Sequence, residues 1–203
     1  MRTLDLNKRK AILQAGISVF ADDGYHTAKI AKIAELAGVA TGSIYRYYPN
    51  KEAIIVVILE QLWEQLADEV RQLIHRTDLQ PVEKLELIID QVFDIFTANP
   101  SLAIIFVNEH HQFMMKGAGR VKALYDAFLD SCEQIVREGV ARHIFNANVD
   151  IKIFRHYIIG AFRHLLQQWT MDPEGFPLNK LRQNLKFIIK NGIMQHAAAH
   201  AHR

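Results

Sequence analysis

The chain has 203 residues, half of them hydrophobic and 23% charged, with only 10 glycines and 5 prolines. This composition excludes a disordered or collagen-like chain, and the length fits one medium domain or a small domain joined to a larger one. The net charge is +2, but residues 1–52 hold eight Lys/Arg and five acidic residues, which gives +3 in the first quarter and −1 in the remainder.

The predicted helices begin with three short ones. Helical spacing of apolar residues predicts a first helix over residues 7–21. A second follows Thr27, whose hydroxyl suits an N-cap, and ends at Gly38, which supplies the left-handed conformation of a tight turn. A third covers residues 41–48 before Pro49 prevents its continuation. Almost nothing in the chain is typical of a strand.

Six longer helices are predicted after this region, which makes about nine in an all-α protein. Prolines, glycines and Asn/Asp clusters separate them. Their approximate ranges are 50–75, 81–98, 101–115, 118–143, 150–170 and 178–195. We expect a three-helix domain over residues 1–52 and a roughly six-helix domain over residues 53–203.

Two short helices joined by a glycine turn under a basic excess indicate a helix-turn-helix, whose second helix enters the DNA major groove. Ile44 and Tyr48 lie four residues apart and are expected to anchor that helix inward. Hydroxyl and cationic side chains around it suit phosphates and base edges. The candidate DNA-binding residues are Thr27, Lys29, Thr41, Gly42, Ser43, Tyr45, Arg46, Tyr47 and Lys51.

The string IAELAGVATGSIYRYYPNKE over residues 33–52 closely resembles the DNA-binding domain of tetracycline-repressor (TetR) family regulators, and FADDGY over residues 20–25 resembles the end of that family's first helix. The resemblance covers about residues 7–55. The family usually has His or another polar residue at the place of Arg46, and Phe is more common at the place of Tyr48; these mild departures bear on the base preference and not on DNA binding itself. The resemblance implies a homodimeric transcription factor, usually a repressor, whose C-terminal helices hold a small ligand that releases operator DNA.

The residues favour a homodimer independently. One helix-turn-helix makes too few contacts for tight specific binding, so two half-sites in a pseudo-palindromic double-stranded operator are expected. The helix over residues 151–169 is apolar on more than one face and, with the last helix, can form a four-helix interface with its twofold mates. The candidate interface residues are Phe154, Ile158, Phe162, Leu165, Leu166, Trp169, Leu181, Leu185 and Ile188.

Large apolar side chains in the middle helices suggest a ligand pocket, although they can equally form an ordinary core, and residues 109–111 can equally form the wet face of a helix. The candidate pocket residues are Trp63, Phe93, Phe96, Phe106, Glu109, His110, Phe113, Phe128 and Tyr157. A hydrophobic effector is favoured, foremost a fatty acyl-coenzyme A, because residues 99–109 and 160–169 are loosely similar to the family's fatty-acid-degradation regulators. The bases eligible for its phosphates are Arg120, Lys122, Arg137, Arg155 and Arg163.

Other functions stay open. A sensor of lipophilic cations would place carboxylates beside aromatic rings, for which Glu60, Glu64 and Glu109 are eligible. An architectural protein would bind DNA broadly, without a ligand. An enzyme is not expected, because no HExxH, CxxC, serine-elbow or phosphate-loop spacing occurs. His196 and His200 are spaced to share Zn²⁺, but a frayed terminus is favoured, so neither metal nor cofactor is expected.

Export and membrane insertion are not expected either. The single cysteine, Cys132, excludes an internal disulfide, which favours the reducing cytoplasm. The first ten residues contain no apolar segment of a signal peptide. The longest apolar run, residues 53–59, is much shorter than the roughly 18 residues that a membrane span needs. We therefore expect a cytoplasmic protein without a membrane partner.

Overall fold

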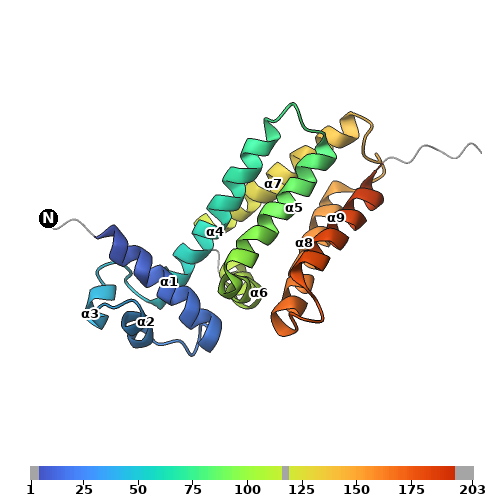
Figure 1. Cartoon of the computed structure of the whole chain (residues 1–203). Helices are drawn as coiled ribbons and strands as arrows, with labels where there is room; N and C mark the ends of the chain where they lie inside the picture. Colours follow the sequence, from blue (N-terminus) through green and yellow to red (C-terminus); the bar gives the residue numbers. More distant parts are fainter. Residues whose placement is uncertain (1–4, 116–118, 195–203) are drawn as a thin grey trace, which may run out of the picture. The chain divides into compact units, whose positions relative to one another are not determined.

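The computed structural model describes residues 5–115 and 119–194, and within these ranges it contains nine α-helices, which confirms the all-α prediction. They are α1 (Leu6–Asp23), α2 (Ile30–Leu36), α3 (Thr41–Ile44), α4 (Lys51–Ile74), α5 (Pro81–Ala98), α6 (Pro100–Met115), α7 (Gly119–Ala141), α8 (Ile151–Met171) and α9 (Leu178–Ile193) (Figure 1). No single helix in the described residues is long and apolar enough to cross a membrane; the sharply bent pair α5 and α6 passes that test only when taken together.

The chain folds into two compact units, which are described separately. The first contains residues up to 65 together with residues 96–125, and the second contains residues 66–95 and those from 126 onward. Helix α6 therefore belongs to the same unit as α1, α2 and α3. The functional division at residue 52 stays a prediction.

In the first unit, α1 is the central support of the DNA-binding region. The Asp5 carboxylate accepts hydrogen bonds from the backbone N–H groups of Asn7 and Lys8 and so caps the helix. One face of α1 is buried, and α2 and α6 pack against α1 (Figure 1). Gly16 permits a close approach to α4, because a Cβ atom there would lie 2.8 Å from Ile54 Cγ2.

Two helix limits near the turn differ from the prediction. Helix α2 begins at Ile30, with Lys29 at its N-cap position and no side-chain cap, so Thr27 is not the N-cap. Regular α3 ends at Ile44, but the backbone continues helically as the N–H groups of Tyr47 and Tyr48 both donate to Ile44 O. Gly38 has φ +65°, so it supplies the predicted left-handed turn.

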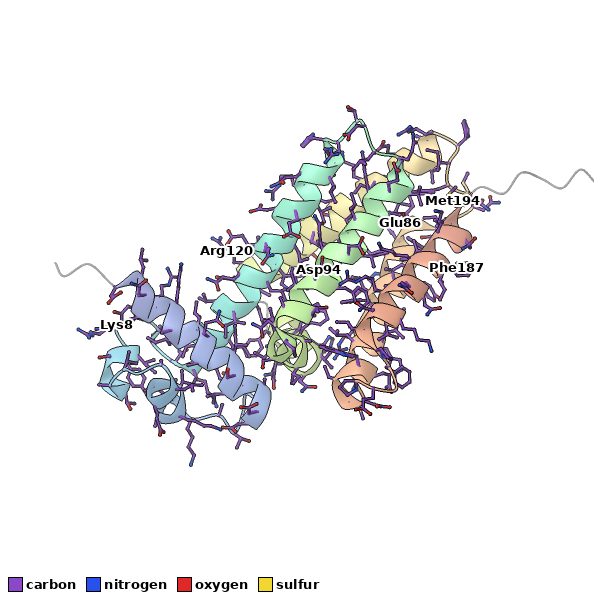
Figure 2. The ribbon with its side chains drawn as sticks, in the orientation of Figure 1. Lys8, Glu86, Asp94, Arg120, Phe187 and Met194 are labelled. Carbon is purple, nitrogen blue, oxygen red and sulfur yellow. The ribbon has the colours of Figure 1, made fainter. Side chains whose placement is uncertain are left out.

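Ion pairs join the helices of the second unit. Asp90 on α5 pairs with Arg182 and Lys186 on α9, while Asp94 pairs with Arg182 and Glu86 with Lys190 (Figure 2, where Glu86 and Asp94 are labelled). Helices α8 and α9 lie side by side. The segment before α8 is tied to the end of α9, because Asn146 N–H donates to Ile193 O.

Candidate DNA-binding surface and effector site

Most of the predicted DNA-binding side chains are exposed around α3. Ile44 is fully buried and Tyr48 nearly so, which confirms that they anchor the segment. Tyr45 is 54% exposed, and its ring is therefore available to a partner. Thr27, Lys29, Thr41, Gly42 and Arg46 are also exposed, whereas Ser43, Tyr47 and Lys51 are half-buried.

Arg46 and Lys51 differ in how far they are engaged within the chain. One guanidinium nitrogen of Arg46 donates to Ser43 Oγ at 3.2 Å on the surface, a contact that a phosphate or base edge can replace. Lys51 Nζ donates to two backbone carbonyls, His26 O at 2.9 Å and Ala28 O at 3.0 Å, and lies 4.8 Å from the Tyr25 ring centroid. Lys51 was predicted to reach phosphate, but in this structure it holds the segment before α2.

An aromatic cluster lies deeper in the first unit, where α4, α6 and α7 meet. The ring of Trp63 lies 4.8 Å from that of Tyr125 and 5.2 Å from that of His110, measured between centroids. The Phe106 ring lies 5.0 Å from that of His110, and the Phe96 ring packs against that of Phe106 in a tilted arrangement, with centroids 5.4 Å apart. Three of these rings belong to buried side chains on α4, α5 and α6, so the predicted residues Trp63, Phe96 and Phe106 do come together, with His110.

Tyr125 is part of this cluster although it was not predicted. It lies four residues after Val121 and three before Phe128, both of which are buried, so helical periodicity places all three on one face of α7. That spacing is the sequence signal that could have identified Tyr125.

Glu109 and Phe113 lie beside the DNA-binding helices. Glu109 Oε1 accepts a buried hydrogen bond of 3.1 Å from the backbone N–H of Tyr25, and Oε2 accepts one of 3.2 Å from Gln112 Nε2. Phe113 meets the Tyr25 ring edge to face at 5.1 Å. Both oxygens of Glu109 are thus occupied within the protein, which disfavours its predicted role as a partner of a cationic ligand.

The remaining predicted pocket residues belong to the second unit. Phe93 packs edge to face on Phe162, with centroids 5.4 Å apart, and Phe128 is buried. The pocket role of Tyr157 stays a prediction: this side chain is 60% exposed on α8 and lies at the surface of the chain. The reason is that α8 is apolar on more than one face, and Tyr157 falls on the outer one.

The charged groups considered for effector binding are engaged to different degrees. Arg120 on α7 pairs with Glu64 at 2.8 Å, and both side chains are about half exposed (Figure 2 labels Arg120). Arg155 pairs with Asp126, Asp130 and Glu133, so three carboxylates already surround its guanidinium group. Arg137 pairs with Glu133.

The predicted interface residues divide into core and surface. Phe162, Leu166, Leu181 and Leu185 are already buried within the chain, so they have little further area to bury in a dimer, and their interface role stays a prediction. Phe154, Ile158, Leu165 and Trp169 are half-buried, and Ile188 is 50% exposed.

Two strongly exposed apolar residues of this region were not predicted as interface residues. Ile153 on α8 is 68% exposed and Phe187 on α9 is 66% exposed. The start of α8 and the end of α9 lie together, because Asn146 N–H donates to Ile193 O.

The described residues give little support for a metal site or for a nucleophilic cysteine. The described residues contain no group of three or more His, Cys, Asp or Glu side chains placed to hold a metal ion. His196, His200 and His202 lie outside the described residues. Burial raises the pKa of the Cys132 thiol to about 12, so it is protonated and a poor nucleophile at neutral pH.

Comparison with known proteins identifies the class. Residues 12–58 match the family described as "Bacterial regulatory proteins, tetR family", and residues 59–192 match "YsiA-like protein, C-terminal region". The chain therefore belongs to the TetR family of transcription regulators, which bind operator DNA. It is a regulator and not an enzyme.

Within this family, the chain is similar to regulators of fatty-acid metabolism. The "Fatty acid metabolism regulator protein" of Bacillus subtilis (strain 168) is 27% identical over 186 residues, which cover 92% of this chain and 95% of that protein. The crystal structure of FadR from Bacillus subtilis in complex with stearoyl-CoA superposes with a TM-score of 0.80 and 27% identity, covering 91% of this chain and 98% of that one. FadR from Bacillus halodurans gives a TM-score of 0.79 and 26% identity, with 90% and 98% covered.

Proposed function

We propose that this protein is a homodimeric repressor whose DNA binding is relieved by a long-chain fatty acyl-CoA. The observation that carries the proposal is the similarity to FadR along nearly the whole chain, which includes the effector-binding part of a relative captured with stearoyl-CoA. In this proposal, residues 1–52 bind DNA, and residues 53–203 bind the effector and the second subunit. The operator is a pseudo-palindrome because two equivalent heads bind it.

The chemistry of the first unit fits an acyl-CoA. The apolar faces of Trp63 and Tyr125 suit a hydrocarbon chain, and the exposed bases Arg120 and Lys122 lie on the same helix as Tyr125. The Arg120–Glu64 pair is weak because both side chains are about half exposed, so a CoA phosphate can replace the carboxylate. We therefore assign Arg120 and Lys122 to the CoA phosphates and the Trp63 cluster to the acyl chain.

A second subunit would cover exposed apolar residues of α8 and α9. Ile153 and Tyr157 on α8 and Phe187 on α9 expose more than half of their surface, and Ile188 on α9 is 50% exposed. Side chains of this kind gathered on two adjacent helices are typical of an interface. The dimer is thus proposed to form through α8 and α9, as predicted, but through their outer faces.

Native mass spectrometry tests the effector class. The purified protein is mixed with equal concentrations of stearoyl-CoA, free CoA, stearate and tetraphenylphosphonium, a lipophilic cation. We expect a dimer that retains stearoyl-CoA alone. Retention of tetraphenylphosphonium in place of stearoyl-CoA would overturn the proposal.

Two arginine variants on α7 test the assignment of the phosphate ligands. Arg120→Ala is expected to weaken stearoyl-CoA binding about tenfold, since a hydrogen bond to a charged group is lost. Arg137→Ala removes an equally exposed arginine that pairs with Glu133, and it should bind like the wild type. Equal effects of the two variants would refute the assignment of Arg120.

A further inference from the structure

The segment between α1 and α2, residues 24–29, is held from two sides. It begins at Gly24, which has φ +73°, and it leads directly into α2 of the helix-turn-helix. From α4, Lys51 Nζ donates to the carbonyl oxygens of His26 and Ala28. From α6, Glu109 accepts the N–H of Tyr25. The position of α2 therefore depends on both of these contacts.

The contact from α6 has the stricter requirement, because it involves a buried carboxylate. Glu109 and Tyr25 lie 84 residues apart in sequence, and their hydrogen bond is buried. A carboxylate that is only 9% exposed requires partners, and it has two, Tyr25 N and Gln112 Nε2. The Tyr25 ring is fixed against Phe20 and Phe113, so the backbone N–H is held in line with the carboxylate.

Glu109 is also next to the aromatic cluster. The ring of its neighbour in the sequence, His110, packs against the rings of Trp63, Phe106 and Tyr125 in tilted or edge-on arrangements. Successive residues on a helix point about 100° apart, so one turn of α6 presents the carboxylate to Tyr25 and the imidazole to the aromatic rings. Any shift of α6 that changes the ring contacts also moves the Glu109 carboxylate.

We propose that Glu109 is a positioning residue for operator binding, which holds residues 24–29 in the DNA-binding arrangement, and that the effector releases DNA by breaking the Glu109–Tyr25 hydrogen bond. The first part goes beyond the proposed function and needs no effector. The second part rests on the proposed function, because it uses the aromatic cluster as the effector site.

Operator affinity without effector tests the first part. The DNA is a duplex selected from random sequences, and fluorescence anisotropy measures binding. Glu109→Ala is expected to lower affinity about tenfold, since one charge-assisted hydrogen bond is lost. Glu109→Gln keeps a carbonyl acceptor and should restore affinity to within about threefold of wild type. Gln112→Ala, which removes the contact to the other oxygen, is the matched control and should bind normally.

A purely structural role for Glu109 would give a different pattern. Circular dichroism shows whether each variant is folded, and hydrogen exchange of the Tyr25 amide reports the hydrogen bond itself. The proposal requires faster Tyr25 exchange in a folded Glu109→Ala protein together with weaker operator binding. Faster exchange with unchanged operator affinity would overturn it.

Stearoyl-CoA added to the wild-type protein tests the second part. Tyr25 exchange should accelerate at the concentrations that release DNA. Release of DNA with unchanged Tyr25 exchange would overturn the coupling. Failure of stearoyl-CoA to release DNA at all would overturn both the effector assignment and the coupling, while the effect of Glu109→Ala on affinity without effector would still stand or fall on its own.

Discussion

Single side chains around α3 are proposed to determine how the protein binds DNA. Ile44 and Tyr48 point inward and their burial fixes the helix, while Tyr45 between them is exposed. Tyr48 is tied further to α1, because its hydroxyl accepts a hydrogen bond from Arg9 Nε. A rigid inner face lets the outer side chains meet the groove without a large loss of conformational entropy.

Tyr45 is expected to contribute a phosphate contact. Tyr45→Ala should lower operator affinity about tenfold, since a hydrogen bond to a charged group is lost. Anisotropy titration with the selected operator measures the change. Tyr45→Phe separates the hydroxyl from the ring: if the contact is a hydrogen bond, the two variants should lose similar affinity. Unchanged binding by Tyr45→Ala would mean that α3 is not the reading helix.

At the residue scale, the sequence predicts only some of the buried side chains and few of their hydrogen-bond partners. Ile44, Tyr48 and Trp63 were identified from spacing and residue type, because local helical periodicity decides which face is buried. The bond between Glu109 and Tyr25 could not, since it joins residues 84 apart whose proximity depends on the packing of α6 against α1. The two carbonyl partners of Lys51 could not be predicted for the same reason, and its contact with phosphate stays a prediction.

The Glu133 carboxylate is expected to make stability depend on pH. Its hydrogen bonds from Arg155, foremost, and from Arg137 hold the pKa of Glu133 below its ordinary value of 4.5. Because the folded-state pKa is the lower one, the stabilisation is complete well above pH 4.5 and is lost as pH falls through the folded-state pKa.

Urea unfolding between pH 7 and about pH 3 measures this contribution. The urea concentration at the midpoint of wild-type unfolding should decrease as the pH drops below about 4.5. The midpoint of Glu133→Gln should decrease less. Glu174→Gln changes an exposed loop carboxylate and serves as the control. Identical pH profiles for the wild type and Glu133→Gln would exclude a contribution from this group.

At the scale of whole elements, close packing decides where a helix tolerates substitution. Gly139 near the end of α7 is buried under the ring of Phe145, and a Cβ atom there would overlap ring atoms Cδ2 and Cε2. The Gly139 carbonyl also accepts the N–H groups of Ile144 and Phe145, so the chain reverses tightly over this residue.

Gly139→Ala is therefore expected to destabilise the second unit by about 1–3 kcal/mol, because the ring must move. Gly192→Ala in α9 is the matched control, since a Cβ atom there meets nothing within 4 Å. It should leave stability unchanged or raise it by less than about 1 kcal/mol. Thermal unfolding followed by circular dichroism compares the two, and equal melting temperatures would contradict the packing argument.

Helix order and type were the most predictable features of the fold. Prolines and glycines bound the long helices α4, α5 and α9, and their predicted limits agree with the structure to within about two residues. The limits of α2 and α3 were less predictable, because such short helices depend on tertiary packing more than on their own propensity.

At the scale of the whole molecule, the proposed dimer would cover the exposed apolar residues of α8 and α9. Ile153→Glu places a charge among them, so it should shift the protein toward monomers and weaken operator binding by removing the second DNA-binding head. Analytical ultracentrifugation measures the oligomeric state. Leu87→Glu adds the same charge at an exposed leucine on α5 and should leave the dimer intact. A dimer unaffected by Ile153→Glu would place the interface elsewhere.

The central claim is that a long-chain acyl-CoA relieves DNA binding by this TetR-family regulator. The most direct measurement is anisotropy of the selected, labelled operator duplex with the wild-type protein, titrated with stearoyl-CoA below its micelle concentration and, separately, with free CoA and with stearate. We predict that stearoyl-CoA lowers operator affinity about 10- to 100-fold, while CoA and stearate have little effect. Operator affinity that stays constant at saturating stearoyl-CoA would contradict the claim.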